Sequence, residues 1–148
     1  MKNIKFIALI ALALTLGMTG CKKGEADNSS DLFGTVWKGE VEYDIDEVYY
    51  GKNEFKFTFS EGKKVLSEGI AYKITKAWSA ETSEEIKATG SFSLKNDKIK
   101  ITLEKPIAGY ESSDVFPVIF EGTISGDKMT LSLNGATCVM TKVTLPEV

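Results

Sequence analysis

From Leu32 onward, apolar and polar side chains alternate along the chain with a period of two. An extended strand points successive side chains to opposite faces, so this period predicts strands with one apolar and one polar face. Turn signals such as Glu61-Gly62 and Asn134-Gly135 separate the alternating stretches. Eight strands are predicted, around residues 37–45, 55–59, 70–74, 86–94, 99–103, 116–124, 129–133 and 137–143.

Strands joined by short turns pair with their sequence neighbours in antiparallel order. Eight strands are enough to close a sheet into a barrel, and closure removes the exposed strand edges. The outward positions are rich in Lys, Glu, Thr and Ser, which argues against a barrel that spans a membrane. The sequence therefore predicts an all-β domain over residues 32–148, an eight-stranded antiparallel up-and-down barrel.

The first twenty residues predict a signal peptide. Lys2 and Lys5 precede a short apolar run at residues 6–16, and small residues then lead to Cys21. The run is too short for a permanent membrane-spanning helix. The segment resembles a bacterial lipoprotein signal, which implies cleavage before Cys21 and attachment of diacylglyceryl and an acyl chain such as palmitate to that residue. We therefore expect a lipoprotein of the bacterial cell envelope, anchored to the outer membrane through Cys21.

Residues 21–31 are expected to form a lipidated flexible tether between membrane and barrel. Residues 22–31 contain no large apolar side chain, so they can bury too little surface to offset the entropy lost on ordering. Lys22 and Lys23 directly follow the lipid site, where they could contact anionic headgroups.

Two missing residue types exclude several classes of function. The chain contains no histidine and no arginine, and after residues 1–20 are removed it carries sixteen lysines against twenty-one acidic residues. Without histidine there is no Ser-His-Asp or Cys-His catalysis and almost no catalytic zinc chemistry. Without arginine, and with a net negative charge, nucleic-acid binding is not expected. We expect no cofactor, no metal site, no catalytic residue and no enzymatic activity.

The densest acidic cluster lies in the first predicted strand and the turn after it. A calcium site fails on its spacing, since Val48 occupies a position that needs an oxygen ligand. The pattern favours a solvated outer face, and a carboxylate-based hydrolase is the remaining catalytic alternative. The cluster consists of Glu40, Glu42, Asp44, Asp46 and Glu47.

Two short motifs are similar to motifs of lipocalin-like (calycin) domains. Residues 32–39 (LFGTVWKG) resemble the opening of these domains, in which a tryptophan at the start of the first strand plugs one end of the barrel. Residues 120–131 (FEGTISGDKMTL) are similar to a hairpin of small lipocalin-like bacterial lipoproteins. The resemblance implies a lipocalin-like barrel with Trp37 as the plug. Where the family commonly places an arginine over the tryptophan, this chain offers Lys142.

Aromatic side chains on the predicted inner faces leave two alternatives open. They line a cup for a small apolar or amphiphilic ligand, or they fill the core of a small barrel. The candidate ligand-binding residues are Trp37, Phe57, Phe59, Tyr72, Phe92 and Phe120.

A second aromatic set lies in the predicted connections between strands, where exposed rings favour contacts with other molecules. These residues are Tyr49, Tyr50, Trp78 and Tyr110. The expected function is therefore non-catalytic binding of a small apolar ligand or of an envelope partner. The alternative is a protein–protein interaction module, such as an inhibitor or accessory subunit, that acts through the loops at one barrel end.

Overall fold

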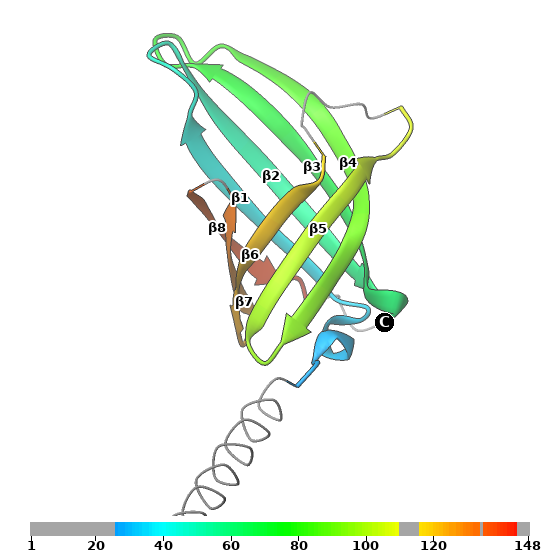
Figure 1. Cartoon of the computed structure of the whole chain (residues 1–148). Helices are drawn as coiled ribbons and strands as arrows, with labels where there is room; N and C mark the ends of the chain where they lie inside the picture. The colour runs from blue at the N-terminus through cyan, green and yellow to red at the C-terminus, as the bar shows by residue number, and fades with distance from the viewer. Residues whose placement is uncertain (1–25, 110–115, 134, 145–148) are drawn as a thin grey trace, which may run out of the picture.

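The protein folds as one closed antiparallel barrel. In the computed structural model, which describes residues 26–109, 116–133 and 135–144, the eight strands pair in chain order, from β1 to β8 (Figure 1). The predicted all-β, eight-stranded up-and-down barrel is confirmed, and it is compatible with a lipocalin-like fold. The strands are β1 (Val36–Asp44), β2 (Tyr49–Ser60), β3 (Lys64–Thr75), β4 (Glu81–Lys95), β5 (Lys98–Pro106), β6 (Val118–Ser125), β7 (Lys128–Leu133) and β8 (Ala136–Lys142).

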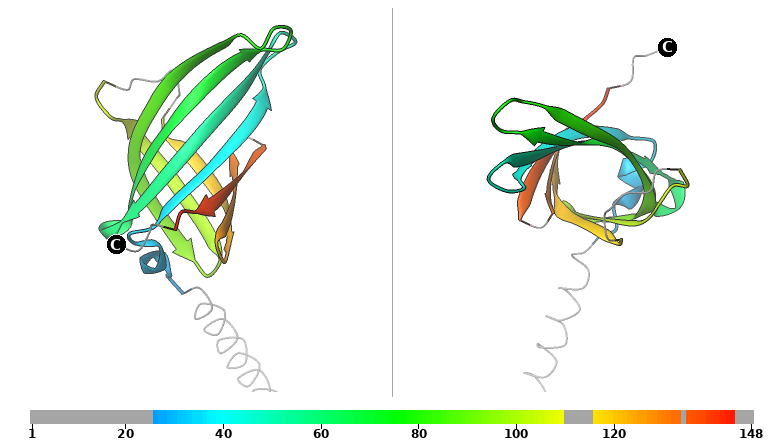
Figure 2. Two further views of the ribbon diagram at one scale, coloured as in Figure 1. Left: turned by 180° about the vertical axis from the view of Figure 1, so that it is seen from behind. Right: turned by 90° about the horizontal axis from the view of Figure 1, so that it is seen from above.

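Pairing of the last strand with the first closes the barrel. Trp37 of β1 is the cross-strand partner of Lys142 in β8, and Glu40 is the partner of Val139. The end-on view in Figure 2 shows the resulting ring of strands. Each of the eight strands thus has a hydrogen-bonded neighbour on both sides over at least part of its length, which leaves the sheet without a free edge strand.

The strands differ greatly in length, and this gives the barrel two unlike ends. β2 and β3 have twelve residues each and β4 has fifteen, whereas β7 and β8 have six and seven. The connections at residues 45–48 and 76–80 therefore project beyond the shorter strands at one end, which we call the far end (Figures 1 and 2). The chain enters the barrel at the opposite end, which we call the tether end.

Residues 26–31 differ from the predicted flexible tether, because they pack on the tether end. The backbone N–H of Asn28 donates to the Leu94 carbonyl at 2.8 Å, and the Leu94 N–H donates to Ser29 Oγ at 2.9 Å. A short 3₁₀ turn, η1 (Ser29–Leu32), then brings Leu32 into the core. Hydrogen bonds, rather than burial of apolar side chains, hold this segment on the barrel. A prediction based on the distribution of apolar residues therefore does not detect them. Cys21 and residues 1–25 lie outside the described residues.

Asp27 joins this segment to the turn between β2 and β3. Its carboxylate accepts hydrogen bonds from the Ser29 hydroxyl at 2.6 Å and from the Lys63 ammonium group, which lies in the 3₁₀ turn η2 (Glu61–Lys63). Lys63 first, and then Ser29, hold the pKa of Asp27 well below its ordinary value. The Asp27 carboxylate is therefore ionised at neutral pH. Its ion pair with Lys63 links the start of the folded chain to the barrel wall.

Glycines allow close approach where the barrel wall curves. A Cβ atom on Gly122 would lie 1.8 Å from the Thr130 carbonyl oxygen, and one on Gly90 would lie 1.9 Å from that of Thr102. The strand register between β4 and β5 shifts between Thr89 and Gly90, whereas Gly122 pairs with Leu131 in a regular register. Both positions need a residue without a side chain, because backbone on the neighbouring strand cannot move away cheaply.

Substitution of Gly122 by alanine should destabilise the fold. The added methyl group meets the Thr130 carbonyl, so β6 and β7 must separate, at a cost of about 1–3 kcal/mol or more. Urea unfolding followed by circular dichroism measures the change. Glu121→Ala on the exposed face of the same strand is the control, and equal midpoints for the two variants would contradict this account.

Candidate functional site

Five of the six candidate ligand-binding residues lie together inside the barrel. Phe57 and Phe59 are 0% exposed, and their rings pack edge-to-face with centroids 6.3 Å apart. The Phe57 ring also lies 5.4 Å from that of Phe120, and the Phe59 ring lies 4.7 Å from that of Phe92. Trp37 is equally buried, on β1 beside Phe57 in the strand register.

These contacts favour the filled-core alternative over a cup. A ring that lined a cavity large enough for water would expose surface to that cavity, yet Phe57 and Phe59 expose none. Edge-to-face pairs at these separations are in ordinary packing contact. An eight-stranded barrel has an interior just wide enough for side chains to fill. In the part of the interior formed by these five residues, the rings occupy the volume that a ligand would need.

Tyr72 lies on the outside of the barrel, and its predicted inner-face position is wrong. Ser67 pairs with the buried Phe57 and points inward, so Tyr72, five residues later on the same strand, points outward. Its hydroxyl contacts a carboxylate oxygen of Glu54 at 3.5 Å. The prediction failed because apolar residues occupy both faces of β3, so the alternation alone does not show which face of this strand points inward.

Trp37, the second residue of β1, is buried near the tether end of the barrel. Its indole Nε1–H donates to Thr35 Oγ1 at 3.0 Å, and the Thr35 hydroxyl donates to the Leu32 carbonyl at 2.6 Å. The ring is 1% exposed and belongs to the core. Lys142 is its cross-strand partner on β8. The tryptophan thus has a structural role, with its one polar atom satisfied.

The acidic cluster does not converge on one point. Glu40 pairs with Lys52 at 3.1 Å, and Asp44 pairs with Lys76 at 2.8 Å. Asp46 instead accepts the backbone N–H groups of Val48 and Tyr49, both at 2.8 Å, and these bonds lower its pKa. Within the described part of the chain, no three His, Cys, Asp or Glu side chains are grouped to hold a metal ion.

An open groove of about 620 Å³ crosses the outside of β8, β1, β2, β3 and β4. Several of its charged side chains form ion pairs: Glu68 lies 2.6 Å from the ammonium of Lys56 and 3.8 Å from that of Lys87. Lys56, above all, lowers the pKa of Glu68. The groove carries both signs of charge in mutual contact, so it leaves little unbalanced charge to select a ligand.

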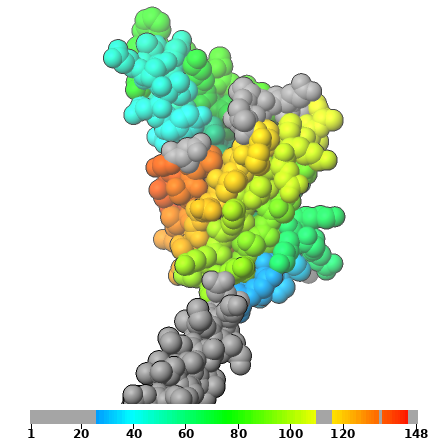
Figure 3. Space-filling view, viewed as in Figure 1, coloured from blue at the N-terminus to red at the C-terminus, as the bar shows by residue number. Residues whose placement is uncertain are grey.

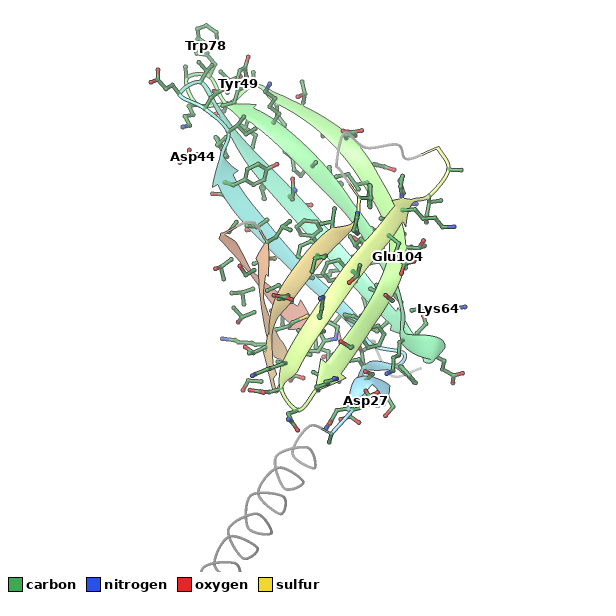
Figure 4. All side chains as sticks on the ribbon, viewed as in Figure 1. Asp27, Asp44, Tyr49, Lys64, Trp78 and Glu104 are labelled. Carbon is green, nitrogen blue, oxygen red and sulfur yellow. The ribbon has the colours of Figure 1, made fainter. Side chains whose placement is uncertain are left out.

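The far end carries the two most exposed large apolar side chains of the described residues, together with a third exposed one. Trp78 is 84% exposed, Val48 is 52% exposed and Ile45 is 44% exposed. We call residues 44–49 and 75–81 the distal tip. Figure 4 shows Trp78, Tyr49 and Asp44 at this end, whereas Asp27 and Lys64 lie at the tether end. The space-filling view in Figure 3 shows the tip as a projection from the barrel.

The two hairpin loops of the distal tip are joined to each other. The backbone N–H of Lys76 donates to the Val48 carbonyl at 2.8 Å, and its ammonium group donates to the Asp46 carbonyl at 2.9 Å. Beneath them, the Lys73 ammonium lies 4.1 Å from the centre of the Tyr49 ring. The apolar side chains are therefore mounted on hydrogen-bonded loops rather than on isolated turns.

Of the four aromatic residues predicted in connections, Trp78 lies in one, between β3 and β4. Tyr49 and Tyr50 lie within β2 instead, and Tyr110 lies outside the described residues. Ile45 and Val48 did not stand out in the sequence as exposed residues, because Ile45 continues the apolar phase of β1. Their exposure becomes evident only from the structure, in which the long strands carry both loops beyond the ends of the shorter strands.

Cys138 is buried, and its thiol donates to the Glu40 carbonyl at 3.5 Å. Burial, and to a lesser degree the nearby Glu40 carboxylate, raise the pKa of the thiol to about 11. A thiol that stays protonated is a weak nucleophile, so this side chain acts as a small apolar residue.

No protein-family model matches this sequence, and no curated protein matches it. Among the described residues, no helix is both long and apolar enough to cross a membrane. The fold and the surfaces described above are therefore the basis for the functional argument.

Phe57→Ala and Tyr72→Ala should separate the inside of the barrel from the outside. Phe57→Ala leaves a void among three rings and should destabilise the fold by about 3–5 kcal/mol. Tyr72→Ala removes a partly buried ring from the outer surface and should cost less, about 1 kcal/mol. The free energy of unfolding in urea measures both. A larger loss for Tyr72→Ala would show that the strand register is not the one described.

Alkylation of Cys138 should be slow in the folded protein. At about pH 8 its thiolate fraction is on the order of 100-fold below that of an ordinary cysteine, and burial slows attack further. Mass spectrometry of the Cys138 peptide after iodoacetamide treatment measures the rate, with the urea-unfolded protein as control. Equal rates in the two states would show that the thiol is accessible.

Proposed function

We propose that this chain is a non-catalytic, lipocalin-like lipoprotein of the bacterial cell envelope, anchored to the membrane through Cys21, that binds an envelope protein at its distal tip. The observation that carries this proposal is the difference between the two ends of the barrel. The chain enters at the tether end, and three exposed apolar side chains, Ile45, Val48 and Trp78, lie on the two loops of the opposite end, where Figure 4 shows Trp78. Two other exposed apolar residues, Ile119 and Val139, are separate from them on the barrel wall.

The tether is short enough to keep the barrel close to the membrane. Ala26 is already hydrogen-bonded to the barrel through its carbonyl, which accepts the N–H of Asn96 at 3.0 Å. Only residues 22–25 separate it from Cys21, so the two Cα atoms lie at most about 18 Å apart. A lipid on Cys21 would therefore hold the tether end near the membrane surface. The distal tip, one long strand away, would point outward from that surface.

The other functions considered for this chain receive less support. Carriage of an apolar ligand needs interior volume, and Trp37 and four phenylalanine rings take up that volume in the described core. A carboxylate-based hydrolase needs two acids held at a working separation. Three of the five acids of the cluster are instead engaged separately, Glu40 by Lys52, Asp44 by Lys76 and Asp46 by backbone N–H groups.

The anchor is tested by the mass of the intact protein extracted from membranes. Wild type should begin at Cys21 and carry the mass of a diacylglyceryl group and an acyl chain. Cys21→Ser should carry no lipid and should retain residues 1–20, because the lipoprotein peptidase acts after lipidation. Cys138→Ser is the matched control and should keep the lipid. An unmodified Cys21 in wild type would refute the anchor and with it the orientation of the distal tip.

A further inference from the structure

We propose that the distal tip binds a protein segment in which an apolar side chain is flanked by lysine or arginine residues. This inference rests on the proposed function and specifies the chemistry of the partner. It combines three properties of the tip, namely its exposed apolar side chains, its charge and its fixed loop geometry.

The apolar side chains supply the contact area. Trp78, Val48 and Ile45 come from two loops that the Lys76–Val48 hydrogen bond holds together. Isolated exposed apolar residues are ordinary on protein surfaces, but a group of them at one projecting end marks an interaction site. Tryptophan is also the residue type most enriched among side chains that dominate binding energy. The tip therefore fits an apolar side chain of a partner better than a purely polar one.

The charge around these side chains is negative. Residues 44–49 and 75–81 contain four carboxylates and one lysine, and the Lys73 ammonium beneath the Tyr49 ring adds a second positive charge, so carboxylates outnumber ammonium groups by four to two. The Lys76 ammonium is already engaged by Asp44 at 2.8 Å and by the Asp46 carbonyl at 2.9 Å. Asp46 is held ionised by the N–H groups of Val48 and Tyr49, whereas Glu47 is exposed. A partner with positive charge beside its apolar group would be attracted and oriented.

The negative charge of the tip disfavours two other binding partners, namely an anionic lipid membrane and a second copy of this chain. An anionic lipid surface repels carboxylates, and membrane binding by surface helices and loops ordinarily depends on lysine or arginine. A second copy of this chain would bring its own four carboxylates against the first set. A basic protein segment would experience neither of these repulsions.

The loop geometry lowers the entropic cost of binding. The Ser79 N–H donates to the Thr75 carbonyl at 2.9 Å, and the Ile45 N–H donates to the Tyr49 carbonyl at 3.2 Å, so each loop is closed by its own backbone bonds. Binding groups that are already fixed lose little conformational freedom when a partner arrives.

A random-peptide phage library panned on the full chain, purified in detergent, tests the proposal. Enriched peptides should carry lysine or arginine on both sides of an aliphatic or aromatic residue. A synthetic peptide of this kind should lose about tenfold or more in affinity with Trp78→Ala and with Val48→Ser. Glu47→Lys should also weaken binding, as should a rise in salt from about 50 to 500 mM. Val139→Ala, at a half-exposed position on the barrel wall, is the matched control and should change affinity less than about twofold.

Several results would overturn the proposal. These are a library that yields no binding peptide, enriched peptides without basic residues, and peptide binding that Trp78→Ala leaves unchanged. Two further results would assign the tip to another occupant. One is quenching of Trp78 fluorescence by brominated phosphatidylglycerol in vesicles that carry the lipidated protein. The other is a dimer in detergent that Trp78→Ala dissociates.

The experiments distinguish failure of this inference from failure of the proposed function. Neutral or acidic peptides that require Trp78 would refute the basic partner while leaving the tip as a binding surface. Peptides that bind equally well to Trp78→Ala, Val48→Ser and wild type would show that the distal tip is not the binding surface. The mass of Cys21 reports on the anchor independently of either result.

Discussion

Ring packing along the barrel axis is the interaction on which the rest of the structure depends. Phe57 contacts Phe55, Phe59 and Phe120, and Phe59 continues the contact to Phe92, so rings from β2, β4 and β6 meet inside one small barrel. Each fully buried ring contributes about 1.5–3 kcal/mol through the hydrophobic effect, and the described chain has no disulfide to add to this. A core filled in this way leaves recognition to the outer surface.

The unequal strand lengths decide which surface that is. β2, β3 and β4 continue past the ends of β7 and β8, so their far halves extend beyond the part of the barrel that β7 and β8 close. On the inner face of this extension the Tyr43 ring lies over Gly51, and a Cβ atom there would be 2.4 Å from Tyr43 Cζ. The extension ends in two joined loops that carry Trp78 and Val48. Its distance from the point where the chain enters suits a protein that is anchored at one end and binds at the other.

The sequence alone predicts the barrel well, because alternation in stretches such as residues 55–59 and 99–103 follows directly from burial of one strand face. It fails at Tyr72, because β3 has Val65 inside and Ile70 outside, and only pairing with β2 fixes the faces. It also fails at residues 26–31, where Ser29 and Asp27 form hydrogen bonds with partners far along the chain. The joined loops of the distal tip depend on such distant contacts as well, so Trp78 could be singled out as a connection residue, but the exposure of Ile45 and Val48 could not be predicted.

The central claim is that the interior of the barrel is filled and that binding takes place on its surface. Titration of the folded wild-type protein with a fluorescent fatty-acid analogue tests this most directly, since that probe suits the interior of a hollow lipocalin-like barrel. The account predicts no saturable binding and an unfolding temperature that the probe leaves unchanged. Stoichiometric binding that raises the unfolding temperature, with the negative heat-capacity change of apolar burial, would contradict it.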